Sequence, residues 1–264
     1  MAEPLLEALR LKKAFDGLAA VDDVSLTIAE RELVGIIGAN GAGKTTFVNI
    51  VTGYLKPDSG QVRFRGGDIT RLTPREITRL GIVRSFQVAQ LFPDLTVLDN
   101  ALIALAVAAR TEGSFFRPLK RYELVEQVFG LLRGFAIDAY AAHKTAALPQ
   151  GVRKLLDIAM AMSGRPRLVL LDEPTSGVSK DEKFLLMDRL LEALVQSGAS
   201  VLFIEHDMEL VERYAQRLIA FNEGRVIADG APAAVLADPQ VRAFVGGAPG
   251  KQPQGERPTS DALA

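Results

Sequence analysis

The sequence predicts an α/β protein built on a mainly parallel sheet with a β-rich edge. Short apolar runs recur along the 264-residue chain, and segments with a helical spacing of apolar residues lie between them. Strands that are apolar throughout are typical of a parallel sheet covered by helices on both faces. A hydrophobic content of 48% is enough for a chain of this length to bury a core. The predicted strands cover residues 24–28, 33–37, 82–86, 168–171, 200–204 and 218–221.

The segments around these strands predict the rest of the architecture. The first 30 residues have the pattern of an antiparallel meander. Residues 181–196 are predicted as a helix, because their apolar side chains share one face at three- and four-residue steps. Residues 88–160 lack a convincing strand and are predicted as an inserted helical subdomain. Residues 247–264 are rich in Gly, Pro, Gln and charge, and this composition predicts a flexible tail.

Composition excludes several classes of function. Lys and Arg number 31 against 32 Asp and Glu, so the formal charge of −1 provides no overall positive field for binding nucleic acid. The absence of cysteine excludes disulfide frameworks, thiolate zinc sites and cysteine nucleophiles. His143 and His206 are the only histidines, which is too few for a histidine metal cluster.

The distribution of apolar residues predicts a cytoplasmic protein. The longest uninterrupted apolar run, residues 101–109, is far shorter than the roughly 20 residues that a membrane span needs. Glu3 and Glu7 lie on either side of Leu5 and Leu6, where a secretory signal would have a cation followed by an apolar run.

Residues 38–45 match the pattern GxxxxGK[ST] directly after the predicted strand at 33–37. Glycines there let successive backbone N–H groups approach a phosphate chain at the start of a helix. Lys44 would reach the β- and γ-phosphates, and the Thr45 hydroxyl would hold Mg²⁺. The alternatives are an ordinary Gly-rich turn and a dinucleotide-binding loop, whose third glycine would fall at Thr46. The predicted nucleotide-binding residues of this segment are Gly38, Ala39, Asn40, Gly41, Ala42, Gly43, Lys44, Thr45 and Thr46.

Two other predicted strands end in titratable residues. The strand at 168–171 leads into Asp172 and Glu173, at the edge where open α/β sheets bind ligands. Asp172 would bind Mg²⁺ directly or through water, and Glu173 would accept a proton from the attacking water or orient it. A merely solvated strand exit is the alternative. The strand at 200–204 ends before His206, which would sense or stabilise charge at the γ-phosphate. His143 is expected to be a solvated helix residue.

With the phosphate loop, Gln87, the acidic pair and His206 in this order, the chain resembles an ABC-transporter ATPase over about residues 5–246. The resemblance implies a P-loop NTPase core of ABC type, with an N-terminal antiparallel β subdomain and an inserted helical subdomain. It implies that ATP and Mg²⁺ are bound and that ATP is hydrolysed. It also implies that Phe15 stacks on adenine and that Gln87 senses Mg²⁺ and the membrane partner. Phe15 as core filler and Gln87 as an ordinary loop amide are the alternatives.

Several short motifs are similar to the ATP-binding subunits of branched-chain amino acid importers. The similarity implies import of branched-chain amino acids or a related small polar or organic solute. An exporter-type motor and a regulatory ATP-binding subunit with one weakly hydrolysing site are the alternatives. The motifs are Phe86-Gln87, Leu91-Phe92, Leu95-Thr96-Val97, Phe115-Phe116, Glu205-His206-Asp207-Met208 and Ala237-Asp238-Pro239.

The resemblance also implies partners. They are a second ABC ATPase subunit, two membrane permease subunits and, indirectly, a solute-binding protein, with this chain on the inner face of the cell membrane. Leu91, Phe92, Phe115 and Phe116 are candidates for contact with permease loops, or core residues of the insertion.

The segment that corresponds to the family's LSGGQ-like signature departs from that pattern. Pro149 stands where a serine usually meets the partner's γ-phosphate, so a hydroxyl and a backbone N–H are both missing. The helix that follows should form normally, since proline is tolerated in a first helical turn. We therefore expect an asymmetric heterodimer with one slow site, and altered cross-talk through the unusual loop at 176–179. The signature residues are Leu148, Pro149, Gln150, Gly151 and Val152.

Overall fold

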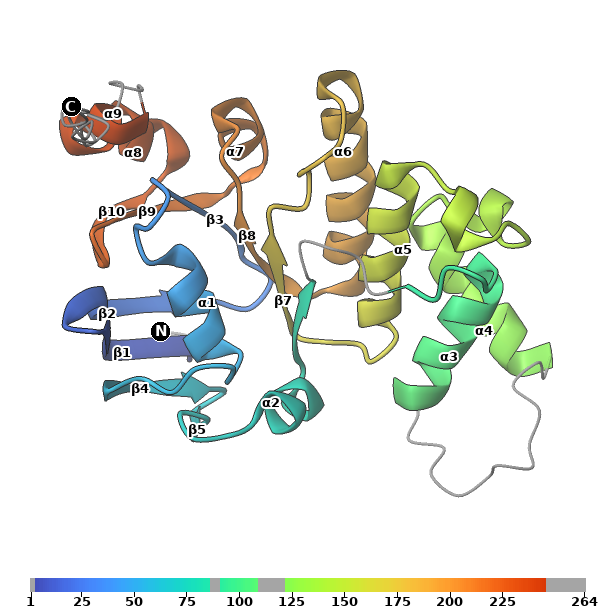
Figure 1. The fold of residues 1–264 in the computed structure, drawn as a ribbon, viewed down its shortest axis with the longest axis horizontal. Helices are drawn as coiled ribbons and strands as arrows, with labels where there is room; N and C mark the ends of the chain where they lie inside the picture. Colours follow the sequence, from blue (N-terminus) through green and yellow to red (C-terminus); the bar gives the residue numbers. More distant parts are fainter. Residues whose placement is uncertain (1–2, 86–90, 109–121, 246–264) are drawn as a thin grey trace, which may run out of the picture.

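The computed structural model describes residues 3–85, 91–108 and 122–245 (Figure 1). The predicted tail at 247–264 lies outside this range, as do Phe86, Gln87, Phe115 and Phe116. Two sheets organise the fold. A six-stranded sheet has the order β10-β9-β3-β8-β7-β6, and a four-stranded sheet has the order β2-β1-β4-β5.

The four-stranded sheet is antiparallel. Strands β1 (Leu6–Phe15) and β2 (Leu18–Ile28) form a hairpin, in which Leu6 pairs with Ile28 and Phe15 with Leu18. The antiparallel N-terminal pattern is therefore confirmed. The sheet is completed by β4 (Ser59–Phe64), which pairs with β1, and by β5 (Gly67–Asp68).

The six-stranded sheet is parallel except at one edge. Its parallel strands are β3 (Leu33–Gly38), β6 (Ile82–Ser85), β7 (Leu168–Asp172), β8 (Ser200–Ile204) and β9 (Arg217–Asn222). The antiparallel edge strand is β10 (Arg225–Gly230), which pairs with β9. The predicted strands are confirmed within the described residues. Because the five strands run in one direction, their carboxyl ends meet at one edge, where ligands bind in such sheets.

Side chains of the parallel strands alternate between two hydrophobic cores. Ile36, Leu170 and Leu202 face the core shared with the four-stranded sheet. Leu171 and Phe203 face the opposite core, under helices. This alternation is what strand geometry requires when both faces are covered.

Helix α1 (Lys44–Val51) lies between the two sheets and buries Phe47, Val48 and Ile50 (Figure 1). Helix α6 (Lys180–Ser197) confirms the helix predicted at 181–196. The smaller helices of the core are α2 (Pro74–Leu80), α7 (Met208–Tyr214), α8 (Pro232–Ala237) and α9 (Pro239–Val245).

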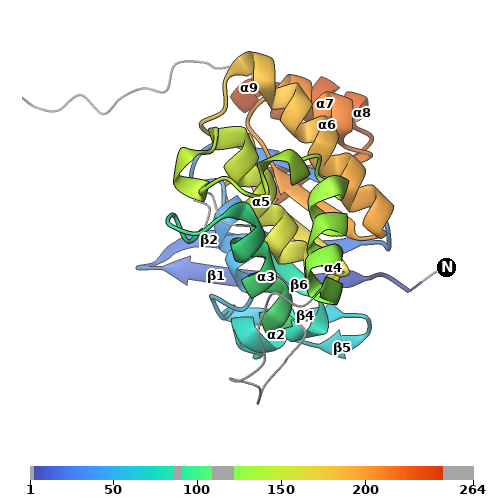
Figure 2. The same ribbon diagram turned by 90° about the vertical axis from the view of Figure 1, so that its right-hand side faces the viewer.

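The described residues between β6 and β7 are helical. They comprise α3 (Val97–Ala108), α4 (Tyr122–Gly134), two 3₁₀ turns (Asp138–Tyr140 and Thr145–Ala147) and α5 (Gln150–Met162). Figure 2 shows α3, α4 and α5 together on one side of the molecule. The only β pairing among the described residues here is an isolated bridge between Thr96 and Lys144. Within the described ranges, none of the helices is long and apolar enough to cross a bilayer.

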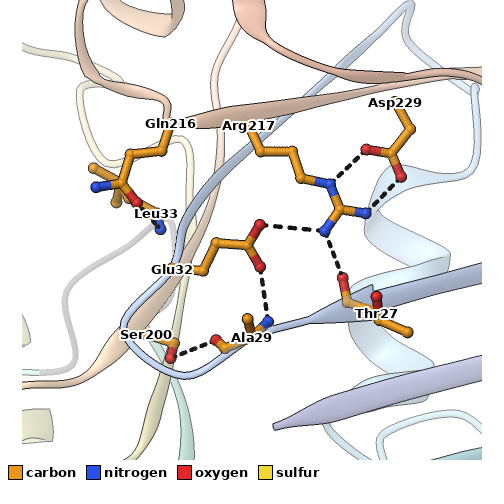
Figure 3. Close-up of polar contacts among 8 residues, drawn as sticks. All are labelled: Thr27, Ala29, Glu32, Leu33, Ser200, Gln216, Arg217 and Asp229. Carbon is orange, nitrogen blue, oxygen red and sulfur yellow. Dashed lines mark hydrogen bonds and ion pairs between the residues drawn. The ribbon is translucent and has the colours of Figure 1, made fainter. Parts of the chain in front are cut away.

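Arg217 ties the two sheets together at the end opposite the strands' carboxyl ends (Figure 3). Its guanidinium donates to both carboxylate oxygens of Asp229 at 2.6 Å, to the Thr27 carbonyl at 3.1 Å and to Glu32 at 3.2 Å. Thr27 belongs to β2, whereas Glu32 directly precedes β3. The hydrogen bonds therefore anchor the start of the strand that leads to the phosphate loop. The residues drawn in Figure 3 are Thr27, Ala29, Glu32, Leu33, Ser200, Gln216, Arg217 and Asp229.

Candidate functional site

The predicted phosphate loop connects β3 to α1 and has no room for side chains at two of its glycines. A Cβ on Gly43, whose φ is 99°, would lie 2.2 Å from the Ala20 carbonyl oxygen. A Cβ on Gly38 would lie 2.4 Å from the Phe221 carbonyl oxygen. Both distances are shorter than carbon and oxygen tolerate. The two glycines are therefore required by close packing against β2 and β9, as well as by the turn itself.

Backbone hydrogen bonds hold the same loop to the turn between β9 and β10. The Gly224 N–H donates to the Ala42 carbonyl at 3.0 Å, and the Asp22 N–H donates to the Gly224 carbonyl at 2.8 Å. The loop, the β2 strand and the β9–β10 turn are thus joined by successive backbone contacts.

Lys44 begins α1 and is buried, with 6% of its surface exposed. Its ammonium donates to the carbonyls of Gly38 at 2.7 Å and Ala39 at 2.9 Å. Burial lowers the pKa of Lys44, and the negative charges of Glu173 and Asp172 oppose that shift. The ammonium is therefore held over the loop and within electrostatic reach of the acidic edge.

The other loop residues differ in exposure. Ala39, Asn40, Gly41 and Thr45 are exposed, whereas Gly38 and Thr46 are half-buried and Ala42 is buried. Exposed N–H groups and the Thr45 hydroxyl at the start of a helix can meet an anion and its counter-ion from solvent.

Asp172 ends β7 and is almost buried beside an arginine. Its Oδ2 accepts a hydrogen bond from Arg84 Nη2 at 2.5 Å, and the two side chains are 13% and 11% exposed. Arg84 also donates from Nη1 to Asn49 Oδ1 at 2.5 Å. The sequence analysis missed Arg84 and Asn49. A cation inside the apolar run at 82–86 could have indicated such a contact, because a buried charge needs a partner.

Glu173 and His206 come together at the carboxyl ends of β7 and β8. Glu173 Oε1 lies 2.9 Å from His206 Nε2, with side-chain exposures of 30% and 43%. Glu173 has a φ of 50°, and its N–H donates to the Ile204 carbonyl at 3.0 Å. The left-handed residue turns the chain sharply out of β7, so that the carboxylate meets the histidine.

A second contact between the same two loops was not predicted. Glu205 is buried, and its Oε1 accepts hydrogen bonds from the Thr175 N–H at 3.0 Å and from the Thr175 hydroxyl at 2.8 Å. Burial raises the pKa of Glu205, although the bonds from Thr175 act in the opposite direction. These bonds hold the segment after Glu173 to the segment that carries His206.

Phe15 ends β1 and is 44% exposed, so the alternative of core filler is wrong. The Lys13 ammonium lies 5.6 Å from the centre of its ring. An exposed aromatic face is compatible with stacking, and adenine stacking stays a prediction. Gln87 lies outside the described residues. His143 is exposed as expected, but it lies in a bend outside the helices.

The signature segment forms the start of α5. Pro149 is its N-cap residue, with φ −57° and ψ 151°, and its carbonyl accepts from the Arg153 N–H at 3.1 Å. The expectation that the helix forms despite the proline is confirmed. Leu148 and Val152 are buried, Gly151 is half-buried, and Gln150 is exposed.

The exposed Gln150 lies beside the loop at 176–179. A Cβ built on Gly177 would be 3.8 Å from Gln150 Nε2. The signature segment and the loop at 176–179 therefore lie close together in space.

The residues at this edge fit a magnesium–nucleotide complex. Within the described ranges, Asp172 Oδ1 has no hydrogen-bond partner, and hydroxyl and carboxylate oxygens are donors that Mg²⁺ prefers. The described residues contain no group of three or more His, Cys, Asp or Glu that could hold a metal by themselves. A site of this kind needs phosphate oxygens and water as further ligands, which is the usual arrangement for Mg²⁺.

Comparisons with known proteins cover almost the whole chain. Residues 21–176 match the family model described as ABC transporter. The probable branched-chain amino acid transport ATP-binding protein LivG of Archaeoglobus fulgidus is 36% identical over 242 residues, which is 90% of this chain and 93% of that protein. The high-affinity branched-chain amino acid transport ATP-binding protein LivG of Salmonella typhimurium is 36% identical over 254 residues, 93% and 99% of the two chains.

Solved structures share the fold. The ADP conformation of MJ1267, an ATP-binding cassette of an ABC transporter, has a TM-score of 0.80 and 32% identity, covering 92% of this chain and 98% of that chain. A dimeric post-hydrolysis state of the cassette MJ0796 bound to ADP and Pi has a TM-score of 0.71 and 26% identity, covering 86% and 98%. The predicted fold class and family resemblance are confirmed.

Proposed function

This chain belongs to the ABC transporter family and is an ATP-hydrolysing subunit of such a transporter, and we propose that it drives import of branched-chain amino acids or a related small solute. The carrying observation for hydrolysis is the 2.9 Å contact between Glu173 and His206, beside the loop of Lys44. The support for the substrate class is the similarity to proteins named for branched-chain amino acid transport, at 36% identity over nearly the full chain.

In the proposed reaction, residues of the loop bind the phosphates of ATP, and residues of the acidic edge promote attack by water. The N–H groups of residues 39–45 and the Lys44 ammonium bind the phosphates of ATP. Glu173 accepts a proton from the attacking water or orients it, and His206 holds the Glu173 carboxylate through their hydrogen bond. Thr45 and Asp172 would hold Mg²⁺, with Gln87 as a further ligand. Bound Mg²⁺ neutralises charge on the β- and γ-phosphates.

In the proposed assembly, this chain and a second ATPase subunit bind ATP between them. The signature of each subunit faces the nucleotide held by the other. Pro149 provides neither a side-chain hydroxyl nor an N–H at its position. Two missing contacts at about 1–3 kcal/mol each would slow the partner's site by roughly one to four decades. The heterodimer would work on two permease subunits at the inner membrane face and receive solute from a binding protein.

A regulatory subunit is the second candidate, and Pro149 is the observation that favours it. The Glu173–His206 contact favours an active subunit instead, because a chain that only binds ATP has no need of a proton acceptor beside the γ-phosphate. The two candidates differ in whether the nucleotide bound by this chain is hydrolysed.

Reconstitution with the partner subunits in proteoliposomes tests both parts of the proposal. We expect ATP-dependent uptake of radiolabelled leucine or valine together with the solute-binding protein. Hydrolysis without uptake of any branched-chain amino acid would overturn the substrate class. Complete lack of hydrolysis at the site of this chain would support the regulatory candidate.

A further inference from the structure

Arg84 is the centre of a buried network that joins three elements. Its guanidinium reaches Asp172 on β7 and Asn49 on α1, both at 2.5 Å, from the middle of β6. With an exposed fraction of 11% against 13% for Asp172, the pair is largely shielded from water. Charged hydrogen bonds in such surroundings are stronger and more directional than those at the surface.

The partners of Arg84 lie next to the proposed metal ligands. Asn49 is four residues after Thr45 on α1, so the two side chains lie on the same helix face, one turn apart. Asp172 is itself a proposed ligand. The guanidinium is therefore hydrogen-bonded to Asp172 itself and to the helix that carries Thr45.

We propose that Arg84 is a positioning residue for the magnesium site, an inference that rests on the proposed function. By holding Asn49 and Asp172 at once, it sets the separation between the Thr45 hydroxyl and the Asp172 carboxylate. It also occupies Oδ2 of Asp172, which leaves Oδ1 for the metal. Mg²⁺ demands near-ideal octahedral geometry, so a shift in this separation weakens binding.

Arginine suits this role better than lysine. A guanidinium is planar, and its donors form a rigid fork that can hold two acceptors in fixed directions. An ammonium is a point charge on a flexible stem and supplies no such geometry. Exchange of Arg84 for lysine therefore keeps the charge near Asp172 but removes the bridge.

The charge of Arg84 has an opposite effect, which the test separates. A cation beside Asp172 repels a bound metal, so its removal on electrostatic grounds alone would tighten metal binding. Loss of the bridge would loosen it. Arg84→Lys changes mainly the bridge, whereas Arg84→Gln changes bridge and charge together.

The test measures Mn²⁺ binding to the purified full chain with saturating ADP, by electron paramagnetic resonance. We expect Arg84→Lys to weaken Mn²⁺ binding about tenfold, as loss of a residue that supports metal ligands commonly does. Asn49→Ala removes the hydrogen bond between Arg84 and α1 and is expected to weaken Mn²⁺ binding about threefold. The affinity for ADP in EDTA should stay within about twofold of wild type, since the proposed role of both residues is to position the metal ligands and not to bind the phosphates.

Arg217→Lys is the matched control, because Arg217 is also a partly buried arginine that bridges acidic groups on different elements (Figure 3). It should lower the melting temperature and leave Mn²⁺ binding unchanged. Unchanged or tighter Mn²⁺ binding in Arg84→Lys would overturn the proposal. If Arg84→Lys does not fold, Asn49→Ala decides. Failure of the wild type to bind Mn²⁺ and ADP would overturn the proposed function itself.

Discussion

Two regions of the molecule would contact ATP in the proposed dimer, and they differ in the polar groups that they offer. At the edge formed by β3, β7 and β8, Glu173 contacts His206 and lies within electrostatic reach of Lys44. The start of α5 presents Pro149, which offers no side-chain cap and no donor. If the proposed dimer forms, this chain would hold its own nucleotide with the residues needed for hydrolysis while contributing little to the nucleotide of its partner.

The largest expected effect lies at the edge that carries Glu173. Glu173→Gln should reduce ATP turnover by about 10²- to 10⁴-fold, because an amide cannot accept the proton of the attacking water. Binding of ATP should persist, since Glu173 does not hold the phosphates. Steady-state hydrolysis and filter binding of labelled ATP measure the two properties. Glu192→Gln, on an exposed part of α6, is the control. Normal turnover in Glu173→Gln would remove the catalytic role of Glu173.

The next effect concerns the phosphate loop. Lys44→Ala should weaken Mg-ATP binding by about 10- to 100-fold, because charge-assisted hydrogen bonds to phosphate are lost. Equilibrium titration with a fluorescent ATP analogue measures the change. Lys56→Ala, at a lysine that donates to the Leu72 carbonyl, should bind as the wild type does. Full affinity in Lys44→Ala would contradict the assignment of this loop as the nucleotide site.

A smaller effect is expected at the start of α5. Pro149→Ser restores a hydroxyl and an N–H, so turnover of the assembled heterodimer should rise about twofold as the slow site joins the active one. Ala146→Ser, three residues upstream, controls for an added hydroxyl. An unchanged rate would mean that the main-chain groups around Gly151 already suffice, and the contrast between the two regions would lose its functional meaning.

The smallest effect is a pH dependence at the edge that carries Glu173. Burial raises the pKa of Glu205 above its unfolded value of 4.5. The folded state therefore binds a proton more tightly than the unfolded state, and stability falls as pH rises from 4.5 through the raised pKa. Glu205→Gln keeps the acceptor for Thr175 and removes the charge. Relative to wild type, it should be increasingly stable above pH 4.5 in urea denaturation. An equal difference at every pH would contradict this account.

The parts of the fold that the sequence predicted are those with local signals. Apolar runs located the parallel strands, and the glycine pattern after 33–37 located the turn between β3 and α1. The acidic pair was found because it follows an apolar run directly. In each case the chemistry lies within a few residues of the pattern that points to it.

The missed features depend on partners far apart in the chain. Strand β4 pairs with β1, although β2, β3 and α1 lie between them in the sequence. Arg84 contacts Asp172 over 88 positions, and Thr175 contacts Glu205 over 30. No spacing rule connects such residues, because only the folded sheet brings them together. A buried cation in an apolar strand indicates that it has a partner, but it does not identify that partner.

The turn between β9 and β10 has a consequence for engineering. Hairpin turns at a sheet edge usually accept inserted tags or fluorescent proteins. Here Gly224 is bonded to Ala42 of the phosphate loop and to Asp22 of β2. An insertion at this position would displace the main-chain groups that are proposed to bind the nucleotide, so we expect a reporter placed there to damage the activity that it was meant to follow.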